Sequence, residues 1–175
     1  MVYYHIASEE NKKLLEEAMK QWHPELQEKG VRIEMIMATS STRDKPAVAH
    51  GGYPALARIR IIGLKDRLTK KYDAEMLVDE RIFKSLKEPQ KLALIDHVLS
   101  HLTLQRTKPT KKCPITSVLY DDLGRPKLKT KKGDWNAGDG FSVVCARHGE
   151  FAIEFENLRL AYGRAQAAAN DGEIK

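Results

Sequence analysis

The chain has 175 residues, of which 42% are hydrophobic and 31% charged, and its formal net charge is +6. This length is enough for one domain with a sizeable core and short for two, and the composition excludes a disordered or fibrous protein. No apolar run approaches the roughly 20 residues that span a bilayer, and the N-terminus lacks the apolar segment of a signal peptide. We therefore expect a single domain over residues 1–175 that stays in the cytoplasm without contacting a membrane.

The two cysteines, Cys113 and Cys145, are far apart and form no CxxC pair. A disulfide framework and a four-thiolate zinc site are therefore excluded. We expect two reduced structural thiols.

The first half of the chain predicts one helix and three strands. Ser8 is a suitable N-cap for an amphipathic pattern that runs to Trp22 and ends near His23-Pro24. Alternating apolar residues then predict half-buried strands over residues 31–37, 57–62 and 74–79. Residues 39–54, rich in Ser, Thr, Gly and Pro, predict a loop.

A second helix is predicted to begin near Pro89, which suits a first helical turn. Its buried stripe is formed by Leu92, Ile95, Leu99 and Leu102. Beside that stripe, His97-Val-Leu-Ser-His101 places two histidines at i and i+4, one above the other on one helix face. This spacing allows one metal ion to be held by both imidazoles, although spacing alone favours two ordinary helix histidines.

The last third predicts a hairpin and a helical end. Residues 117–120 and 127–131 form the predicted arms, joined by a turn that contains Gly124 and Pro126. Residues 141–149 and 150–169 predict helix, with Gly149 as a C-cap. Residues 170–175 are expected to fray.

Basic residues concentrate in one segment, from Arg106 to Lys132. This segment contains nine basic residues and two aspartates, which gives it a net charge of +7. The rest of the chain therefore has a net charge of −1. Within it, Lys127, Lys129 and Lys131 alternate and would project from one face of a strand.

Three blocks of sequence, in chain order, together cover roughly residues 45–150. They are residues 50–67 (HGGYPALARIRIIGLKDR), residues 73–79 with 92–102 (DAEMLVD, LALIDHVLSHL), and residues 121–129 with the stretch to 147–149 (DDLGRPKLK, RHG). Together these blocks resemble the putative phage metallopeptidase family, a small zincin-like group of phages and prophages. The resemblance implies an α+β fold of the minimal metallopeptidase type, a mixed sheet of about three to five strands packed on the HxxxH helix.

The active-site helix of that family reads Asp-His-Glu-Leu-x-His. Asp96, His97, Leu99 and His101 match it, so the resemblance implies that the two histidines are zinc ligands. Val98 stands where the family has the glutamate that acts as general base on a metal-bound water. No catalytic residue is therefore predicted at this position.

A third zinc ligand is also in question, since a catalytic zinc takes three protein ligands and a water. The family commonly has a histidine where Gly133 stands, just before Asp134. Asp134 and His148 are the remaining candidates. Asp134 is more often a turn residue than a ligand, and His148 is better explained as a helix C-terminal residue favoured by the helix dipole. Asp96 could orient an imidazole, with a partner elsewhere than its helix neighbour.

These departures predict a phage or prophage protein with a metallopeptidase fold and impaired catalysis, a pseudoenzyme for which the resemblance implies zinc as cofactor. A different carboxylate acting as base, Glu75 or Asp79, is one alternative. Another is a non-catalytic binding protein whose basic hairpin (residues 106–132) engages nucleic acid or a host protein during infection. Its predicted contact residues are Arg125, Lys127, Lys129, Lys131 and Lys132, with Tyr120 and Trp135 placed to stack on bases. The simpler interpretation of this segment is a solvated hairpin edge protected by lysines.

Overall fold

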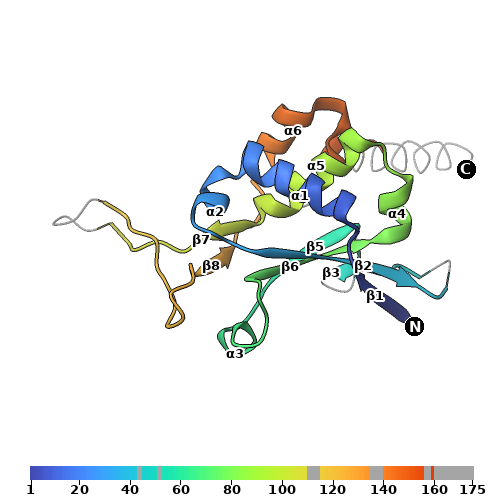
Figure 1. Cartoon of the computed structure of the whole chain (residues 1–175). Helices are drawn as coiled ribbons and strands as arrows, with labels where there is room; N and C mark the ends of the chain where they lie inside the picture. The colour runs from blue at the N-terminus through green and yellow to red at the C-terminus, as the bar shows by residue number, and fades with distance from the viewer. Residues whose placement is uncertain (43–44, 51–52, 110–114, 135–139, 156–158, 160–175) are drawn as a thin grey trace, which may run out of the picture.

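Four strands form the centre of the computed structural model, in the order β1 (Val2–Ile6), β2 (Ile33–Ser40), β6 (Ala74–Asp79) and β5 (Ala57–Ile61). β2 and β6 are parallel, whereas β1 and β5 pair antiparallel at the two edges. The structure describes residues 1–42, 45–50, 53–109, 115–134, 140–155 and 159. In Figure 1 the two long helices, α1 (Glu9–Trp22) and α5 (Glu88–Ser100), lie together on one side of the sheet.

Alternation along the central strands determines which side chains face the helices. Successive residues of a strand point to opposite faces, so Met35 and Met37 of β2 pack in the main core with Val98 and Leu99 of α5. The other face carries a smaller cluster that includes Ala38, Val48 and Leu77. The helix layer thus covers the larger core.

The shorter elements complete the domain around this sheet. They are α2 (Pro24–Glu28), β3 (Ala49–His50), β4 (Tyr53–Pro54), α3 (Leu64–Arg67), α4 (Glu80–Ser85), β7 (Leu102–Leu104), β8 (Leu128–Thr130), α6 (Ser142–His148) and the 3-10 turn η1 (Gly149–Phe151). The predicted α+β class with a mixed sheet is confirmed. No helix in the described ranges is long and apolar enough to cross a membrane.

Several predicted elements form as expected. The Oγ of Ser8 accepts a hydrogen bond from the Asn11 N–H at 3.4 Å and caps α1, and a proline lies in the first turn of α5. β6 matches its predicted range, and Gly149 ends α6 with a positive φ of 54° that suits glycine.

Other predictions were wrong or fall on undescribed residues. The predicted loop over residues 39–54 contains the end of β2 and the β3–β4 pair, and neither β1 nor α4 was expected. The predicted hairpin forms next to its turn, where Tyr120 and Pro126 make an antiparallel bridge, but β8 pairs with β7 and not with residues 117–120. Those residues instead bridge both segments, since Leu119 N–H donates to Gln105 and Lys127 N–H donates to Leu119. Most of the predicted helix over residues 150–169, the tail over residues 170–175, Cys113 and Trp135 lie outside the described residues, whereas Cys145 is a free thiol.

Candidate metal centre

His97 and His101 lie at the end of α5 and bring their imidazoles together. The Nε2 atoms of the two rings are 3.4 Å apart, and the ring centroids are 5.0 Å apart. His97 belongs to the last turn of the helix and His101 is its C-cap residue. The i, i+4 spacing therefore produces the convergence that the sequence predicted.

The other nitrogen of each ring is held by an oxygen acceptor. Nδ1 of His97 lies 2.7 Å from Oε1 of Glu154, and Nδ1 of His101 lies 2.9 Å from the carbonyl oxygen of Lys131. A carbonyl oxygen and a carboxylate accept hydrogen bonds, so both Nδ1 atoms carry the proton. In the neutral rings, both Nε2 atoms then present lone pairs toward each other.

Two facing lone pairs repel each other unless a cation or a proton lies between them. Zinc–nitrogen bonds of about 2.0–2.1 Å at a tetrahedral angle place two ligand nitrogens about 3.4 Å apart. The observed separation of 3.4 Å fits this value. Histidine ligands also typically donate their second N–H to a carboxylate or a backbone carbonyl, which is the arrangement seen here. The pair is therefore suited to hold a zinc ion.

Glu154 is a buried carboxylate behind His97 that the sequence reading missed. It is 5% exposed, and its Oε1 also accepts the N–H of Phe141 at 3.1 Å. Burial alone raises the pKa of Glu154, but the hydrogen bonds from His97 and from the Phe141 N–H outweigh this and lower it. Glu154 is therefore ionised beside His97 at neutral pH.

Phe141 closes one side of the histidine pair. Its ring packs edge-on against both imidazoles, at centroid distances of 5.7 Å to His97 and 4.7 Å to His101, and it is fully buried. An apolar wall of this kind limits water beside the rings and strengthens electrostatic interactions there.

Asp134, a predicted third ligand, is bonded to the start of α6. Its two carboxylate oxygens accept the backbone N–H and the hydroxyl of Ser142, each at 2.7 Å. These hydrogen bonds lower the pKa of Asp134. The observed contacts are those of a helix cap. Its role as a zinc ligand stays a prediction.

His148, the other candidate, lies on Asp96 rather than beside the histidine pair. Its Nε2 is 2.9 Å from Oδ2 of Asp96. The same buried carboxylate contacts His23 at 2.7 Å and accepts two bonds from Nη1 of Arg147, at 2.9 and 3.1 Å. Burial opposes ionisation of Asp96, but its bond to His23 and the charge of Arg147 outweigh it and lower the pKa. Asp96 thus contacts the imidazoles of His23 and His148, and neither residue belongs to the pair formed by His97 and His101.

No group of three or more His, Cys, Asp or Glu side chains that could hold a metal is present within the described part of the chain. The described site therefore consists of two imidazoles and their two hydrogen-bond acceptors. Val98, at the family's glutamate position, is 1% exposed and belongs to the main core.

The predicted basic surface is only partly formed as expected. Lys127, Lys129 and Lys131 are exposed, on the strand whose Leu128 is buried, and Lys132 is exposed as well. Arg125 does not join them, since its guanidinium lies 2.7 Å from the buried Asp73. A buried partner that is distant in sequence thus removes Arg125 from the exposed row.

Paired histidines on a helix that packs against a mixed sheet define a metallopeptidase-like α+β domain. The family model described as putative phage metallopeptidase matches residues 3–163, and the chain therefore belongs to that family. No curated protein and no solved structure matches the chain. Membership confirms the resemblance found in the three sequence blocks, and it implies a metal, commonly zinc.

Proposed function

We propose that this phage metallopeptidase-family protein binds zinc between His97 and His101 and is impaired in peptide hydrolysis. The main support for zinc binding is the distance of 3.4 Å between the two Nε2 atoms. Because both Nδ1 atoms are engaged with oxygen acceptors, the ring tautomers are already those of metal ligands.

Bound zinc supplies Lewis acidity at this position. The protein's own residues fix the site around it. Glu154 orients His97, and the Lys131 carbonyl orients His101. Phe141 keeps one side of the pair apolar.

Impaired catalysis follows from the missing base. Val98 cannot take a proton and is buried in the core. Glu154 is bonded to the far nitrogen of His97, so it orients the ring rather than handling water. Glu75 is paired with Arg60 at 2.8 Å, and Asp79 caps α4 and accepts the Ala47 N–H. General-base assistance is typically worth about 10²–10⁴-fold in rate.

Zinc content of the purified protein tests the metal part. We expect one zinc per chain, bound tightly enough to compete with a colorimetric chelator, and a loss of that binding in His97→Ala. His50→Ala, which removes an exposed histidine on β3, is the matched control and keeps the metal. Zinc-free wild-type protein that takes up none on titration contradicts the proposal, as does undiminished binding in His97→Ala.

Hydrolysis of a fluorogenic casein substrate tests the catalytic part. With saturating zinc, we expect no more turnover than in the zinc-free protein. Hydrolysis that requires zinc and is lost in His97→Ala contradicts the impairment and shows that another group acts as base.

A second candidate function is binding of nucleic acid by the exposed lysines in and next to β8. Lys127 and Lys129 both project from the side opposite the buried Leu128, with a repeat close to that of backbone phosphates. The salt dependence of duplex DNA binding tests it. Replacing both lysines with Gln should flatten the slope by about 0.9 for each lost phosphate contact. The double variant Lys13→Gln and Lys20→Gln removes the same charge from α1 and should leave the slope unchanged.

A further inference from the structure

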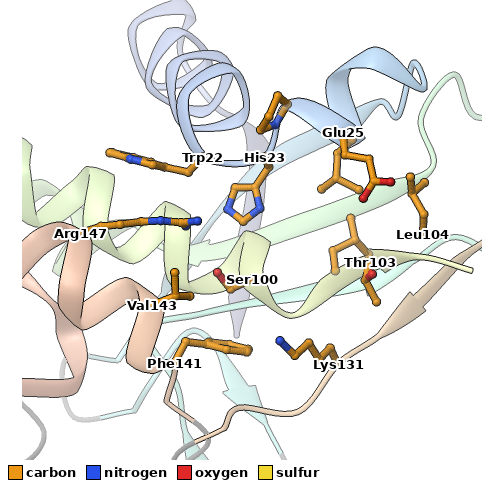
Figure 2. Close-up of a pocket in the computed structure, with 13 residues that line it drawn as sticks. Trp22, His23, Glu25, Ser100, Thr103, Leu104, Lys131, Phe141, Val143 and Arg147 are labelled. Atoms are coloured by element: carbon orange, nitrogen blue, oxygen red, sulfur yellow. The ribbon is translucent and has the colours of Figure 1, made fainter.

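A pocket of about 260 Å³ opens beside the histidine pair. Its wall includes Lys131 and Phe141, the two residues that contact His101 through a carbonyl and a ring. Figure 2 shows the pocket enclosed by α1 and α2 residues on one side and by these two residues on the other. Neither His97 nor His101 lines the pocket itself, so Lys131 and Phe141 are the residues that connect it to the pair.

Cationic groups approach the pocket from different elements. In Figure 2 the guanidinium of Arg147 points toward His23, and the amine of Lys131 extends along the Phe141 ring, 5.6 Å from its centroid. Arg147 lines the cavity, and within the described residues it bonds Asp96 through Nη1 alone. Lys131 has no ion pair within the described ranges and is the main uncompensated charge.

The one acidic side chain of the wall is already neutralised. Glu25 forms an ion pair with Arg106, which comes from the segment after β7. Asp96 lies fully buried behind His23 and Arg147 and accepts bonds from both. The pocket surface therefore favours an anion over a cation.

The remaining walls combine the hydroxyls of Ser100 and Thr103 with an apolar part that suits a short carbon chain. Trp22, Leu104 and Val143 line the cavity together with the Phe141 ring. A volume of about 260 Å³ is below the usual range for whole small-molecule ligands and leaves room for a peptide side chain. An apolar part beside a cationic end matches an aliphatic side chain that carries a carboxylate.

We propose that this pocket binds the carboxylate side chain of a glutamate or aspartate in a peptide presented to the histidine pair, with Lys131 as its principal partner. The assignment rests on the proposed function, because it places the rest of that peptide across His97 and His101. It names acidic peptides as the class that this member of the family recognises.

The test compares two peptides by NMR titration of the full-length protein loaded with zinc. The probes are acetyl-Ala-Glu-Ala-amide and its Gln counterpart, which differ in charge but hardly in shape. We expect the glutamate peptide to bind about tenfold more tightly, since a charge-assisted bond is stronger than a neutral one. Lys131→Met should abolish this preference and leave zinc binding intact, because the carbonyl that holds His101 is retained.

The matched control is Lys129→Met, which removes the same charge two residues earlier, from β8, without touching the pocket. It should retain the preference for glutamate. Equal binding of the two peptides, no binding of either, or an equal loss in Lys129→Met overturns the proposal. So does single-stranded DNA binding that requires Lys131 but not Lys129, because it would assign the pocket to phosphate. If the wild-type protein binds no zinc, the result contradicts the metal site and not the pocket. The preference for the glutamate peptide is therefore also measured without zinc, and its persistence there shows that the pocket stands even if the metal site fails.

Discussion

Glu154 lies 2.7 Å from Nδ1 of His97 across 57 residues of sequence, and it is the buried carboxylate that orients the first histidine of the pair. The same oxygen accepts the Phe141 N–H, so one carboxylate fixes both an imidazole and the aromatic wall beside it. Oε2 of Glu154 is buried and has no hydrogen-bond partner within the described residues. Within the described residues, the hydrogen bonds of the Glu154 side chain therefore all converge on Oε1, the oxygen beside His97.

Replacing Glu154 with Gln should weaken zinc binding about 10–100-fold, because a neutral amide holds the His97 N–H less strongly than a carboxylate does. Chelator competition measures the affinity, and circular dichroism checks that the fold is kept. Glu150→Gln, an exposed glutamate four residues earlier, serves as the control and should bind zinc like the wild type. Unchanged affinity in a folded Glu154→Gln protein would show that the carboxylate supports the fold alone.

Val98→Glu, which restores the residue that the family has at this position, should destabilise the protein rather than revive catalysis. The side chain of Val98 is surrounded by the main core, where an ionised carboxylate has no partner. The free energy of unfolding should fall by about 3 kcal/mol or more, as urea denaturation would measure.

The exposed Val143 of α6 offers a comparison for that variant. Val143→Glu should change the unfolding free energy by no more than about 0.5 kcal/mol. A stable Val98→Glu protein with zinc-dependent hydrolysis would show instead that the helix rotates to expose this position.

The sequence could predict the histidine pair because its geometry is local. An i, i+4 spacing determines the relative placement of two side chains on one helix, whatever the rest of the chain does. Glu154 could not be found in this way, since no spacing relates it to His97. The partners of Asp96 were missed for the same reason, since His23 and Arg147 come from different elements.

In the fold, too, local features could be predicted from the sequence and contacts between distant residues could not. β6 was predicted over its full range because it is buried and bounded by polar residues, whereas β1 has four exposed residues of five and no clear alternation. Arg125 looked like a member of the basic row, but its buried contact with Asp73 spans 52 residues. The sequence pattern does not predict which strands or charged side chains pair with partners that are distant in the chain.

Zinc should stabilise the protein against unfolding if it binds only the folded pair. At a free zinc concentration 100 times the Kd, linkage adds about 2.7 kcal/mol to the free energy of unfolding. Thermal denaturation with and without zinc measures this shift. The shift should vanish in His101→Ala and persist in His5→Ala, which removes a half-exposed histidine near Glu80. Equal shifts in both variants would place the zinc elsewhere.

Asp96 joins three parts of the helix layer, since its partners are His23 at the end of α1 and Arg147 and His148 on α6. It is fully buried, so removing its charge leaves the guanidinium of Arg147 without its partner. Asp96→Asn should therefore lower the free energy of unfolding at neutral pH by about 3 kcal/mol or more.

The pH dependence of that loss follows from the lowered pKa of Asp96. A carboxyl whose pKa is lower in the folded than in the unfolded state stabilises the protein above the unfolded value, here about 3.8, and this contribution is lost as the pH falls through the folded pKa. Denaturant unfolding should show the wild-type protein losing its advantage over Asp96→Asn only below about pH 3.8. Asp122→Asn removes an exposed aspartate and should follow the wild-type curve throughout. A constant difference between wild type and Asp96→Asn down to lower pH would mean that the aspartate acts through its shape and hydrogen bonds, and not through its charge.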